Sequence, residues 1–301
     1  MPSVNDSSVY VGVELGGTKM VVAASQDGLT VSRREQVPTT DPDTTLRSLR
    51  DAIREVAGEE RIEAVGLASF GPIDLRAESD SFGQMLATPK PGWTGVDIVE
   101  GITGGLDVPV GVDTDVNGAV LAEALHGAGS DYRHVAYLTV GTGVGGGIWT
   151  DGGVLHGANH PEVGHIRVPR QREDHHTSSC PFHDDCLEGM ASGTAVRERW
   201  GTAAQDLGHL TPAATKLEAW YLARGIAGLS AVVPVEVVII GGGLSHLPDL
   251  HAQVAAALDE ASGRYPPVPF AEGGPTIVPP GLGSDSGVLG AIELAKAAKR
   301  G

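Results

Sequence analysis

The amino-acid sequence predicts an α/β protein whose 301 residues divide into two lobes. Short apolar runs rich in β-branched residues end in glycines or acidic residues, and continuous apolar strands of this kind are buried on both faces of an α/β sheet. Segments with helical spacing of apolar residues lie between them. The chain also has 43 glycines, many of them directly after the apolar runs, where glycine lets the backbone approach a ligand closely.

Five apolar runs are predicted to form strands, and each ends in a short turn of glycines, acids or hydroxyl residues. Ligands of open α/β sheets bind at the carboxyl ends of the strands, so these turns form the predicted functional edge. The predicted strands are Val9–Val13, Ala64–Ala68, Val108–Val112, His134–Val140 and Val235–Ile240.

Six further segments are predicted to form helices. We expect the chain to pass from one lobe to the other after the Asp113–Asp115 turn, and the last helix to pack back onto the N-terminal lobe. The small lobe is then expected to comprise residues 1–117 and 287–301, and the large lobe residues 118–286. The predicted helices are Thr44–Val56, Gly118–Leu125, Gly193–Trp200, Ala213–Leu229, Leu250–Ala261 and Gly287–Lys299.

The net charge is strongly negative at −17, from 38 acidic residues and 21 lysines or arginines. Such a charge argues against a nucleic-acid backbone or an anionic membrane as partner, because both are polyanions. The N-terminus lacks the basic segment and apolar core of a signal peptide, and no apolar stretch approaches the roughly 18–20 residues of a membrane span. We therefore expect a soluble, cytoplasmic protein.

Both cysteines of the chain lie in one short segment. Cys180 and Cys186 flank His183 in a C-x2-H-x2-C array, and His165 lies fifteen residues before Cys180. Thiolates and imidazoles at such short spacing are the ligands of a tetrahedral zinc site. With four protein ligands the site has no open position, so zinc is expected to shape the loop rather than to activate water.

Two alternatives to this ligand set remain open at the sequence level. The cysteines could form a disulfide, although a cytoplasmic protein would keep them reduced. His175 or His176 could also replace one of the histidine ligands. Glu162 and Glu188 flank the predicted ligands, and their carboxylates are suited either to holding pairs of sugar hydroxyls or simply to solvation at the surface.

Three glycine-rich turns follow predicted strands and are candidates for cradling a nucleotide. Backbone N–H groups in such turns bind phosphates, and glycine leaves room for a purine or ribose. Each turn could instead be a hairpin without a ligand, and the first lacks the spacing of a P-loop. The residues expected to contact the cofactor are Gly16, Gly17, Thr18, Lys19, Thr142, Gly143, Gly145, Gly242 and Gly243.

Asp115 is the candidate general base. It ends an apolar strand, and a carboxylate there can accept a proton from an alcohol as the oxygen attacks phosphorus. Asp113 would share a face of the strand with Asp115, and Thr114 would not, if the strand extends that far. The alternative role for either acid is to cap the helix that begins near Gly118.

Trp93 lies in the run T-P-K-P-G-W. Its ring is expected either to offer an apolar face at the rim of the site or to anchor local packing.

Taken together, these motifs resemble the ROK family of sugar kinases, and most closely its fructokinase branch. The resemblance spans roughly residues 9 to 297. The similar blocks, in order, are V-E-L-G-G-T-K, A-S-F-G-P-I-D-L, T-P-K-P-G-W, D-T-D-V-N, T-V-G-T-G-V-G-G-G, H-P-E-V-G-H, C-P-F-H-D-D-C-L-E-G, I-I-G-G-G and L-G-S-D-S-G-V-L-G-A.

The resemblance implies an actin-like, ribonuclease H-like fold of two lobes, with ATP and Mg²⁺ in the cleft. Asp115 matches the catalytic base of the family. The positions that match zinc ligands are His165, Cys180, His183 and Cys186. The positions that match sugar contacts are Gly71, Pro72, Thr114, Asp115, Glu162, His165 and Glu188.

Three positions depart from many glucokinases of the family. Thr114 stands where they have Asn, His183 where they have a third zinc-binding cysteine, and Glu14 where many members have Asp. Each departure is similar to the fructokinase branch. The sequence therefore predicts ATP-dependent phosphorylation of a hexose, with D-fructose at O6 favoured, by a protein that the resemblance implies is a homodimer.

Rival functions are a kinase of the same fold acting on mannose, glucose or an N-acetyl amino sugar, a sugar-responsive regulator, and a catalytically silent sugar-binding module. Regulators of the ROK family carry a DNA-binding domain before the first strand. Here only about eight residues precede that strand, and the charge is acidic, so the regulator is not favoured. Asp115 argues against the silent module.

Overall fold

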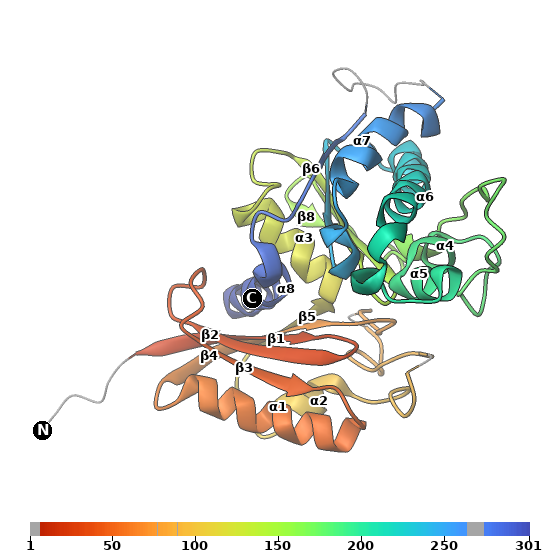
Figure 1. Cartoon of the computed structure of the whole chain (residues 1–301). Helices are drawn as coiled ribbons and strands as arrows, with labels where there is room; N and C mark the ends of the chain where they lie inside the picture. The colour runs from red at the N-terminus through yellow and green to blue at the C-terminus, as the bar shows by residue number, and fades with distance from the viewer. Residues whose placement is uncertain (1–6, 77, 89, 264–273) are drawn as a thin grey trace, which may run out of the picture. The chain divides into compact units, whose positions relative to one another are not determined.

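The computed structural model describes residues 7–76, 78–88, 90–263 and 274–301 (Figure 1). The chain forms two compact units, each built around its own five-stranded sheet. The first unit contains the described residues up to Ala122, together with His156–His160 and Ser284–Gly301, and the second contains Glu123–Leu155 and the described part of Pro161–Gly283. Within the described residues, no helix has the length and apolar character that crossing a membrane requires.

The sheet of the first unit is mixed, with the strand order β3-β2-β1-β4-β5. Its first three strands form an antiparallel meander, and β4 and β5 add to β1 in parallel. The strands are β1 (Ser8–Leu15), β2 (Lys19–Ser25), β3 (Arg33–Pro38), β4 (Arg61–Ser69) and β5 (Val110–Thr114).

Helices cover both faces of this sheet. The helices are α1 (Pro42–Ala57), α2 (Ile98–Thr103), α8 (Ser286–Arg300) and the start of α3 (Asp115–His126). In this unit α1 lies on one face of the sheet and α8 on the other (Figure 1). Met20 and Val22 join the core on the α1 side, whereas Val21 and Ala23 pack with α8, because side chains alternate along β2. The last helix thus packs on the N-terminal sheet, as predicted. Gly66 permits this close approach, since a Cβ there would lie 1.8 Å from the carbonyl oxygen of Ala291.

The second unit repeats the same sheet plan, with the strand order β10-β9-β6-β7-β8. An antiparallel meander is again extended by two parallel strands. The strands are β6 (His134–Val140), β7 (Val144–Thr150), β8 (Gly153–Val154), β9 (Val237–Gly241) and β10 (Thr276–Val278).

A large core fills one face of the second sheet. Leu138 of β6 and Ile240 of β9 pack in one cluster with Leu222 and Ile226. The helices of this unit are α4 (Leu187–Ala191), α5 (Gly193–Trp200), α6 (Thr211–Val232) and α7 (Leu250–Ala261). Short 3-10 turns are η1 (Val163–His165), η2 (Ala204–Asp206), η3 (Gly208–Leu210), η4 (Gly243–His246) and η5 (Gly283–Asp285).

All five predicted strands and all six predicted helices occur. Three have the predicted ends, namely His134–Val140, Gly193–Trp200 and Leu250–Ala261, and the others have shifted ends. The strand predicted at Val108–Val112 lies two residues later, at Val110–Thr114, so the turn that holds the predicted base starts later too. The prediction missed β2, β3, β7, β8 and β10.

Candidate active site

The turn from β5 into α3 holds the predicted general base. Asp115 is the first residue of α3, and its Oδ1 accepts a hydrogen bond from Val116 N–H at 2.9 Å. The hydroxyl of Thr114 accepts from the N–H of Asn117 at 3.2 Å and so caps the helix. The positive end of the helix dipole favours negative charge on Asp115.

Asp113 has a different role from Asp115. The condition for a shared strand face is not met, because β5 ends at Thr114. Asp113 is 5% exposed. Its Oδ1 accepts from Thr114 N–H at 2.8 Å and from Asn117 Nδ2 at 2.7 Å, and its Oδ2 lies 2.9 Å from His156 Nε2. Asp113 therefore holds the turn together, while Asp115 stays half-buried at the helix start.

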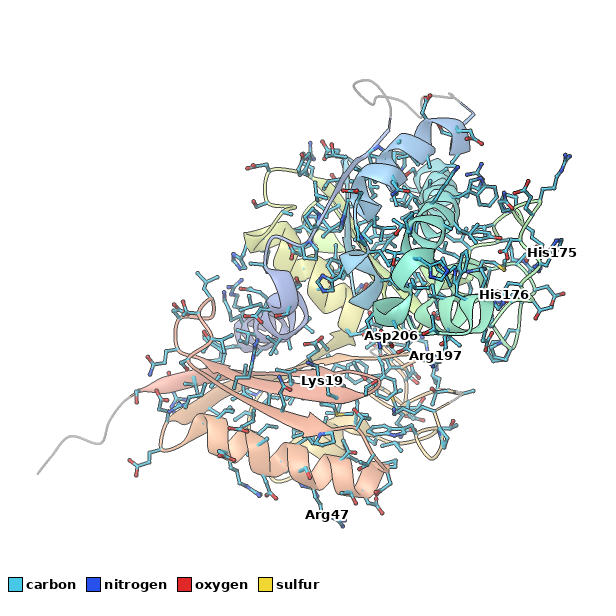
Figure 2. All side chains as sticks on the ribbon, viewed as in Figure 1. Lys19, Arg47, His175, His176, Arg197 and Asp206 are labelled. Atoms are coloured by element: carbon cyan, nitrogen blue, oxygen red, sulfur yellow. The ribbon has the colours of Figure 1, made fainter. Side chains whose placement is uncertain are left out.

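The first predicted phosphate turn, Gly16–Thr18, is a tight hairpin turn between β1 and β2. A Cβ at Gly16 would lie 2.4 Å from the carbonyl oxygen of Lys19, the first residue of β2 (Figure 2). Glu14 lies beside Gly287 at the start of α8. Burial raises the pKa of Glu14, and the charge of Lys19 acts in the opposite direction.

The second glycine turn borders a cavity of about 630 Å³ within the second unit. Gly141 and Thr142 line this cavity. Gly193 N–H at the start of α5 donates to the Gly141 carbonyl at 2.7 Å, and the Thr194 hydroxyl donates to the Thr142 carbonyl at 2.9 Å. The volume lies within the range of small-molecule sites. Its polar lining side chains include Arg197 (Figure 2), Gln205, Thr211 and His246.

The third glycine turn closes the same cavity from β9. Gly242 has a φ of 85°, and a Cβ on it would lie 2.6 Å from the backbone nitrogen of Val140. Only glycine fits there without displacing β6. Gly243 lines the cavity.

Gly143 and Gly145 were also predicted to contact the cofactor, and the structure places them in the β6–β7 hairpin. A Cβ on Gly143 would lie 2.5 Å from Glu188 Oε2, and Gly145 is paired with Thr139 inside the β6–β7 hairpin. Neither belongs to the lining of the cavity that the described residues form. The glycine run is therefore partly a hairpin and only partly a cavity wall.

Four soft ligands meet in the loop before α4. The ligand atoms of His165, Cys180, His183 and Cys186 all lie within 4.8 Å of one another. Cys180 Sγ lies 3.9 Å from His165 Nδ1 and 3.7 Å from His183 Nδ1. Tetrahedral zinc bonds imply ligand separations of roughly 3.5–3.8 Å, so the residues fit this metal.

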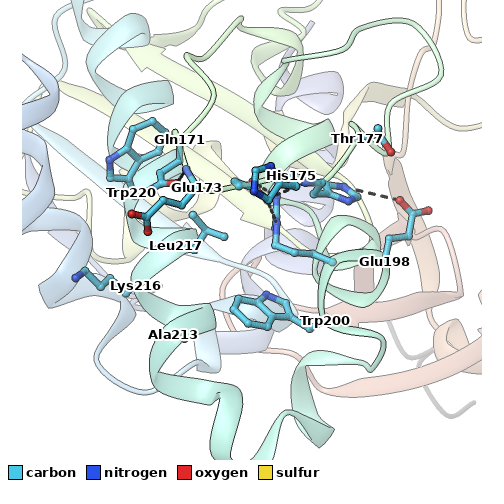
Figure 3. Close-up of a pocket in the computed structure, with 13 residues that line it drawn as sticks. Gln171, Glu173, His175, Thr177, Glu198, Trp200, Ala213, Lys216, Leu217 and Trp220 are labelled. Atoms are coloured by element: carbon cyan, nitrogen blue, oxygen red, sulfur yellow. Dashed lines mark hydrogen bonds and ion pairs between the residues drawn. The ribbon is translucent and has the colours of Figure 1, made fainter.

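The geometry bears on both alternatives for this cluster, a disulfide and a ligand role for His175 or His176. Both cysteines are buried free thiols. His175 and His176 lie outside the four-residue set and line a second cavity of about 720 Å³ between their loop, α5 and α6 (Figures 2 and 3). His176 Nε2 instead lies 3.2 Å from the hydroxyl of Ser179.

The predicted sugar carboxylates of the second unit lie next to this cluster. Glu188 Oε2 accepts a hydrogen bond from Val144 N–H at 3.0 Å, which fixes its side chain at the start of β7. A Cβ on Gly164 would lie 3.5 Å from the Cβ of Glu188. The carbonyl of Glu162 accepts from His165 N–H at 3.0 Å. The turn from Glu162 to His165 and Glu188 therefore form one group.

In the first unit, Trp93 is fully buried, donates from Nε1 to the Thr40 carbonyl at 3.2 Å and meets Phe70 edge to face at 5.3 Å. It is a packing anchor, and the rim position considered from the sequence is wrong. Gly71 and Pro72 are joined by a cis peptide bond directly after β4.

A buried ionic network lies beneath the second cavity. Arg199 binds Asp174 through Nε at 3.1 Å and Nη2 at 3.0 Å, and the Tyr221 hydroxyl donates to Asp174 at 2.6 Å. Arg199 Nη1 lies 3.6 Å from Glu218 Oε1. Glu218 is fully buried, its oxygens have no hydrogen-bond partner among the described residues, and burial raises its pKa well above the usual value.

Sequence reasoning did not identify Asn117 or His156. Asn117 lies three residues after Thr114, and this spacing is typical of a hydroxyl cap and the N–H that it accepts. His156 carries no such local signal, because its partner Asp113 is 43 residues away in the chain.

A meander extended by two parallel strands occurs in both units, with glycine turns and acids where strands end. This repeated plan defines an actin-like, ribonuclease H-like α/β protein of the sugar kinase class.

The chain belongs to the ROK family, whose sequence profile matches residues 10–298. It is 39% identical over 304 residues to the fructokinase of Zymomonas mobilis subsp. mobilis, covering 98% of this chain and 99% of that protein. It is 34% identical to the fructokinase of Pediococcus pentosaceus, covering 95% and 97% of the two chains. The ROK hexokinase of Thermus thermophilus matches the structure with a TM-score of 0.79 at 29% identity, over 97% of this chain and all of that one. These comparisons confirm the predicted family and fold.

Proposed function

We propose that the protein transfers the γ-phosphoryl group of ATP to O6 of D-fructose. The observation that supports this proposal most strongly is the position of Asp115 at the start of α3. The chain is also related to two fructokinases over nearly its full length. In phosphoryl transfer the protein mainly positions the reactants and neutralises the charge on the phosphate oxygens. Residues suited to both tasks are present.

Asp115 accepts the proton of the sugar hydroxyl as that oxygen attacks phosphorus. Thr114 and Asp113 keep the turn in place. The N–H groups of the Gly16–Thr18 turn and of the turn at Gly141 donate to phosphate oxygens, and the cavity beside Thr142 takes the nucleoside. Glu14 would supply a carboxylate oxygen of the kind that Mg²⁺ prefers, and the bound cation would neutralise phosphate charge. The residues assigned to the sugar are Gly71, Pro72, Thr114, Asp115, Glu162, His165 and Glu188.

Zinc is the proposed structural metal of the loop before α4. Its four ligands would leave no position for water, so the metal would shape the loop that presents Glu188. We further propose that the chain works as two lobes, residues 1–117 with 287–301 and residues 118–286, as a homodimer in the cytoplasm. The separate sheets of the two compact units support the division into lobes.

A coupled ADP-release assay over fructose, mannose, glucose and N-acetylglucosamine tests the function. The expected result is the highest kcat/KM with fructose, and a product whose phosphorus NMR spectrum shows a 6-phosphate. A higher kcat/KM with another hexose would replace the proposed substrate, and no ADP release with any of them would reject the kinase.

A further inference from the structure

The segment His156–His160 belongs to the first unit, although the chain on either side of it belongs to the second. Leu155 hydrogen-bonds back to Ile148 of β7 and Pro161 leads directly to Glu162. We refer to residues 156–160 as the strap. The chain thus leaves the second unit for five residues, contacts the first unit and returns immediately before a proposed sugar contact.

At its far end, the strap is fixed by hydrogen bonds between its side chains and the backbone of residues 73–75. Asn159 accepts from Leu75 N–H at 3.2 Å through Oδ1 and donates to the Ile73 carbonyl at 3.0 Å through Nδ2. His160 Nε2 accepts from Ile73 N–H at 3.3 Å. An asparagine that pairs with both groups of a peptide segment acts like a neighbouring strand, so the strap has a defined position on the segment after Gly71 and Pro72.

At its near end, the strap presents His156 to the catalytic turn. Asp113 is an acceptor only, so the imidazole nitrogen 2.9 Å from Oδ2 carries a proton that it donates. Asn117 Nδ2 also lies 3.4 Å from this nitrogen and donates one of its two hydrogens to Asp113 Oδ1 at 2.7 Å. It cannot donate the other to His156 Nε2 when that nitrogen is itself protonated. His156 therefore supplies the donor for the second oxygen of a buried carboxylate whose first oxygen is already used twice.

Loss of this donor would free Asp113 to reorient. Asp113 bonds Thr114 N–H and the Asn117 side chain, which lie on either side of Asp115 in the chain. A buried carboxylate without a partner on one oxygen seeks another donor or water. Movement of Asp113 would then shift both anchors of the turn, and a displacement of about 1 Å at a reacting group can cost roughly 100-fold in rate.

We propose that His156 is a positioning residue that holds Asp115 in its reactive place by binding Asp113. This inference rests on the proposed function for its effect on rate, but its structural part does not. Only five residues separate His156 from Glu162, so the strap also joins the proposed sugar-binding turn to the segment that contacts Asp113.

Kinetics of His156→Ala, His156→Gln and a surface control, His209→Ala, test the effect on rate. Gln can place an amide N–H near the position of the imidazole Nε2, so it should restore the bond that Ala removes. We expect His156→Ala to lower kcat about tenfold with KM for fructose within about threefold, and Gln to recover most of kcat. His209→Ala should match the parent protein.

Hydrogen exchange of the peptide that contains residues 113–118 tests the position of the turn without turnover. His156→Ala should speed this exchange about tenfold, Gln should restore protection, and exchange in β6 should not change. In a folded His156→Ala protein, unchanged exchange of this peptide or unchanged kcat would overturn the proposal. If the parent protein phosphorylates no hexose, the proposed function fails, and the exchange result alone decides whether His156 positions the turn.

Discussion

Asp115 lies where a helix begins rather than on a strand, and this placement decides what its substitution should do. Asp115→Asn keeps a side chain of the same size that can still accept from Val116 N–H. It cannot take a proton at neutral pH. General bases contribute about 10²–10⁴-fold to rate, so kcat should fall by about that factor. This corresponds to an activation free energy that is roughly 3–5 kcal/mol higher, with little change in sugar binding.

The control for this variant has to be chosen from the structure. Asp113→Asn would disturb the turn, because Asp113 accepts from three groups. Asp97→Asn is better matched, since Asp97 caps α2 through Glu100 N–H and Asn caps equally well. Steady-state kinetics of Asp115→Asn with kcat within about tenfold of the parent would remove Asp115 as the base.

Gly193 offers a second test at residue scale, directed at the nucleotide. A Cβ on Gly193 would lie 2.8 Å from the carbonyl oxygen of Gly141, so Gly193→Ala should push the turn into the cavity. We expect KM for ATP to rise about tenfold, which corresponds to about 1.4 kcal/mol, with KM for fructose nearly unchanged.

Gly153→Ala is the matched control, because no atom lies within 4 Å of a Cβ at that position. A folded Gly193→Ala protein with the parent's KM for ATP would separate this turn from the nucleotide site.

At the scale of elements, the loop between η1 and α4 depends on its proposed metal. The purified protein should contain about one zinc per chain by elemental analysis. Cys180→Ser should lose it and lower the melting temperature, because the free energy of metal binding stabilises the folded loop. His175→Ala should retain zinc, since His175 lies outside the ligand set. Protein prepared without chelator that contains no zinc would contradict the proposal.

The buried Glu218 of α6, which lies near Arg199 of α5, should make the free energy of unfolding depend on pH. Burial raises the pKa of this carboxyl in the folded state above its ordinary value of 4.5. Above that value the unfolded chain loses the proton while the folded chain retains it, so this group lowers the free energy of unfolding as pH rises. Asp174 adds no slope there, because its pKa is lowered and it is ionised in both states.

Glu218→Gln removes this titration. The stability of the variant relative to the parent should therefore increase as pH rises above about 5, as measured by urea unfolding. A difference that stays constant, or that falls with pH, would show that Glu218 is ionised in the folded protein.

The strength of the sequence signal explains which elements could be predicted. Val9–Val13 and His134–Val140 are continuous apolar runs, and both are strands. β7 could not be recognised, because Gly145–Gly147 reads as a loop and becomes a strand only through pairing with β6. β3, R-R-E-Q-V-P, has a mostly exposed polar pattern at the sheet edge and depends on β2 for its hydrogen bonds.

In the candidate site, contacts between residues close together in the chain could be predicted, and contacts between residues far apart could not. The array from Cys180 to Cys186 predicted a cluster that the structure assembles, because three ligands within one loop cannot lie far apart. The contact of His156 with Asp113 depends on the strap, whose path follows from tertiary packing. The same is true of Gly143, which lies against Glu188 rather than in the cavity.

At the scale of the whole molecule, the two units share one sheet plan that the sequence does not show as a repeat. Gly12, Gly66 and Gly111 pair across the first sheet and let α8 lie on it. The corresponding strands β6 and β9 have no such row, since Leu138 and Ile240 fill a core there instead. The two sheets share a strand order but pack different side chains against their helices. The repeated plan therefore leaves no repeat in the sequence.

The oligomeric state is the last prediction, and it concerns the whole chain. We expect a homodimer, on the resemblance to the family and because most soluble oligomers are two-fold dimers. Each chain carries a net charge of −17, so two copies repel one another at low ionic strength. A dimer that forms despite this charge needs an apolar interface, and its dissociation should then be favoured by low salt rather than by high salt. Light scattering at micromolar concentration should give about twice 30.9 kDa, with the dimer fraction constant or higher as salt is added. The mass of a single chain at moderate salt would contradict the dimer, and dissociation by added salt would show that ion pairs, not apolar contacts, hold it together.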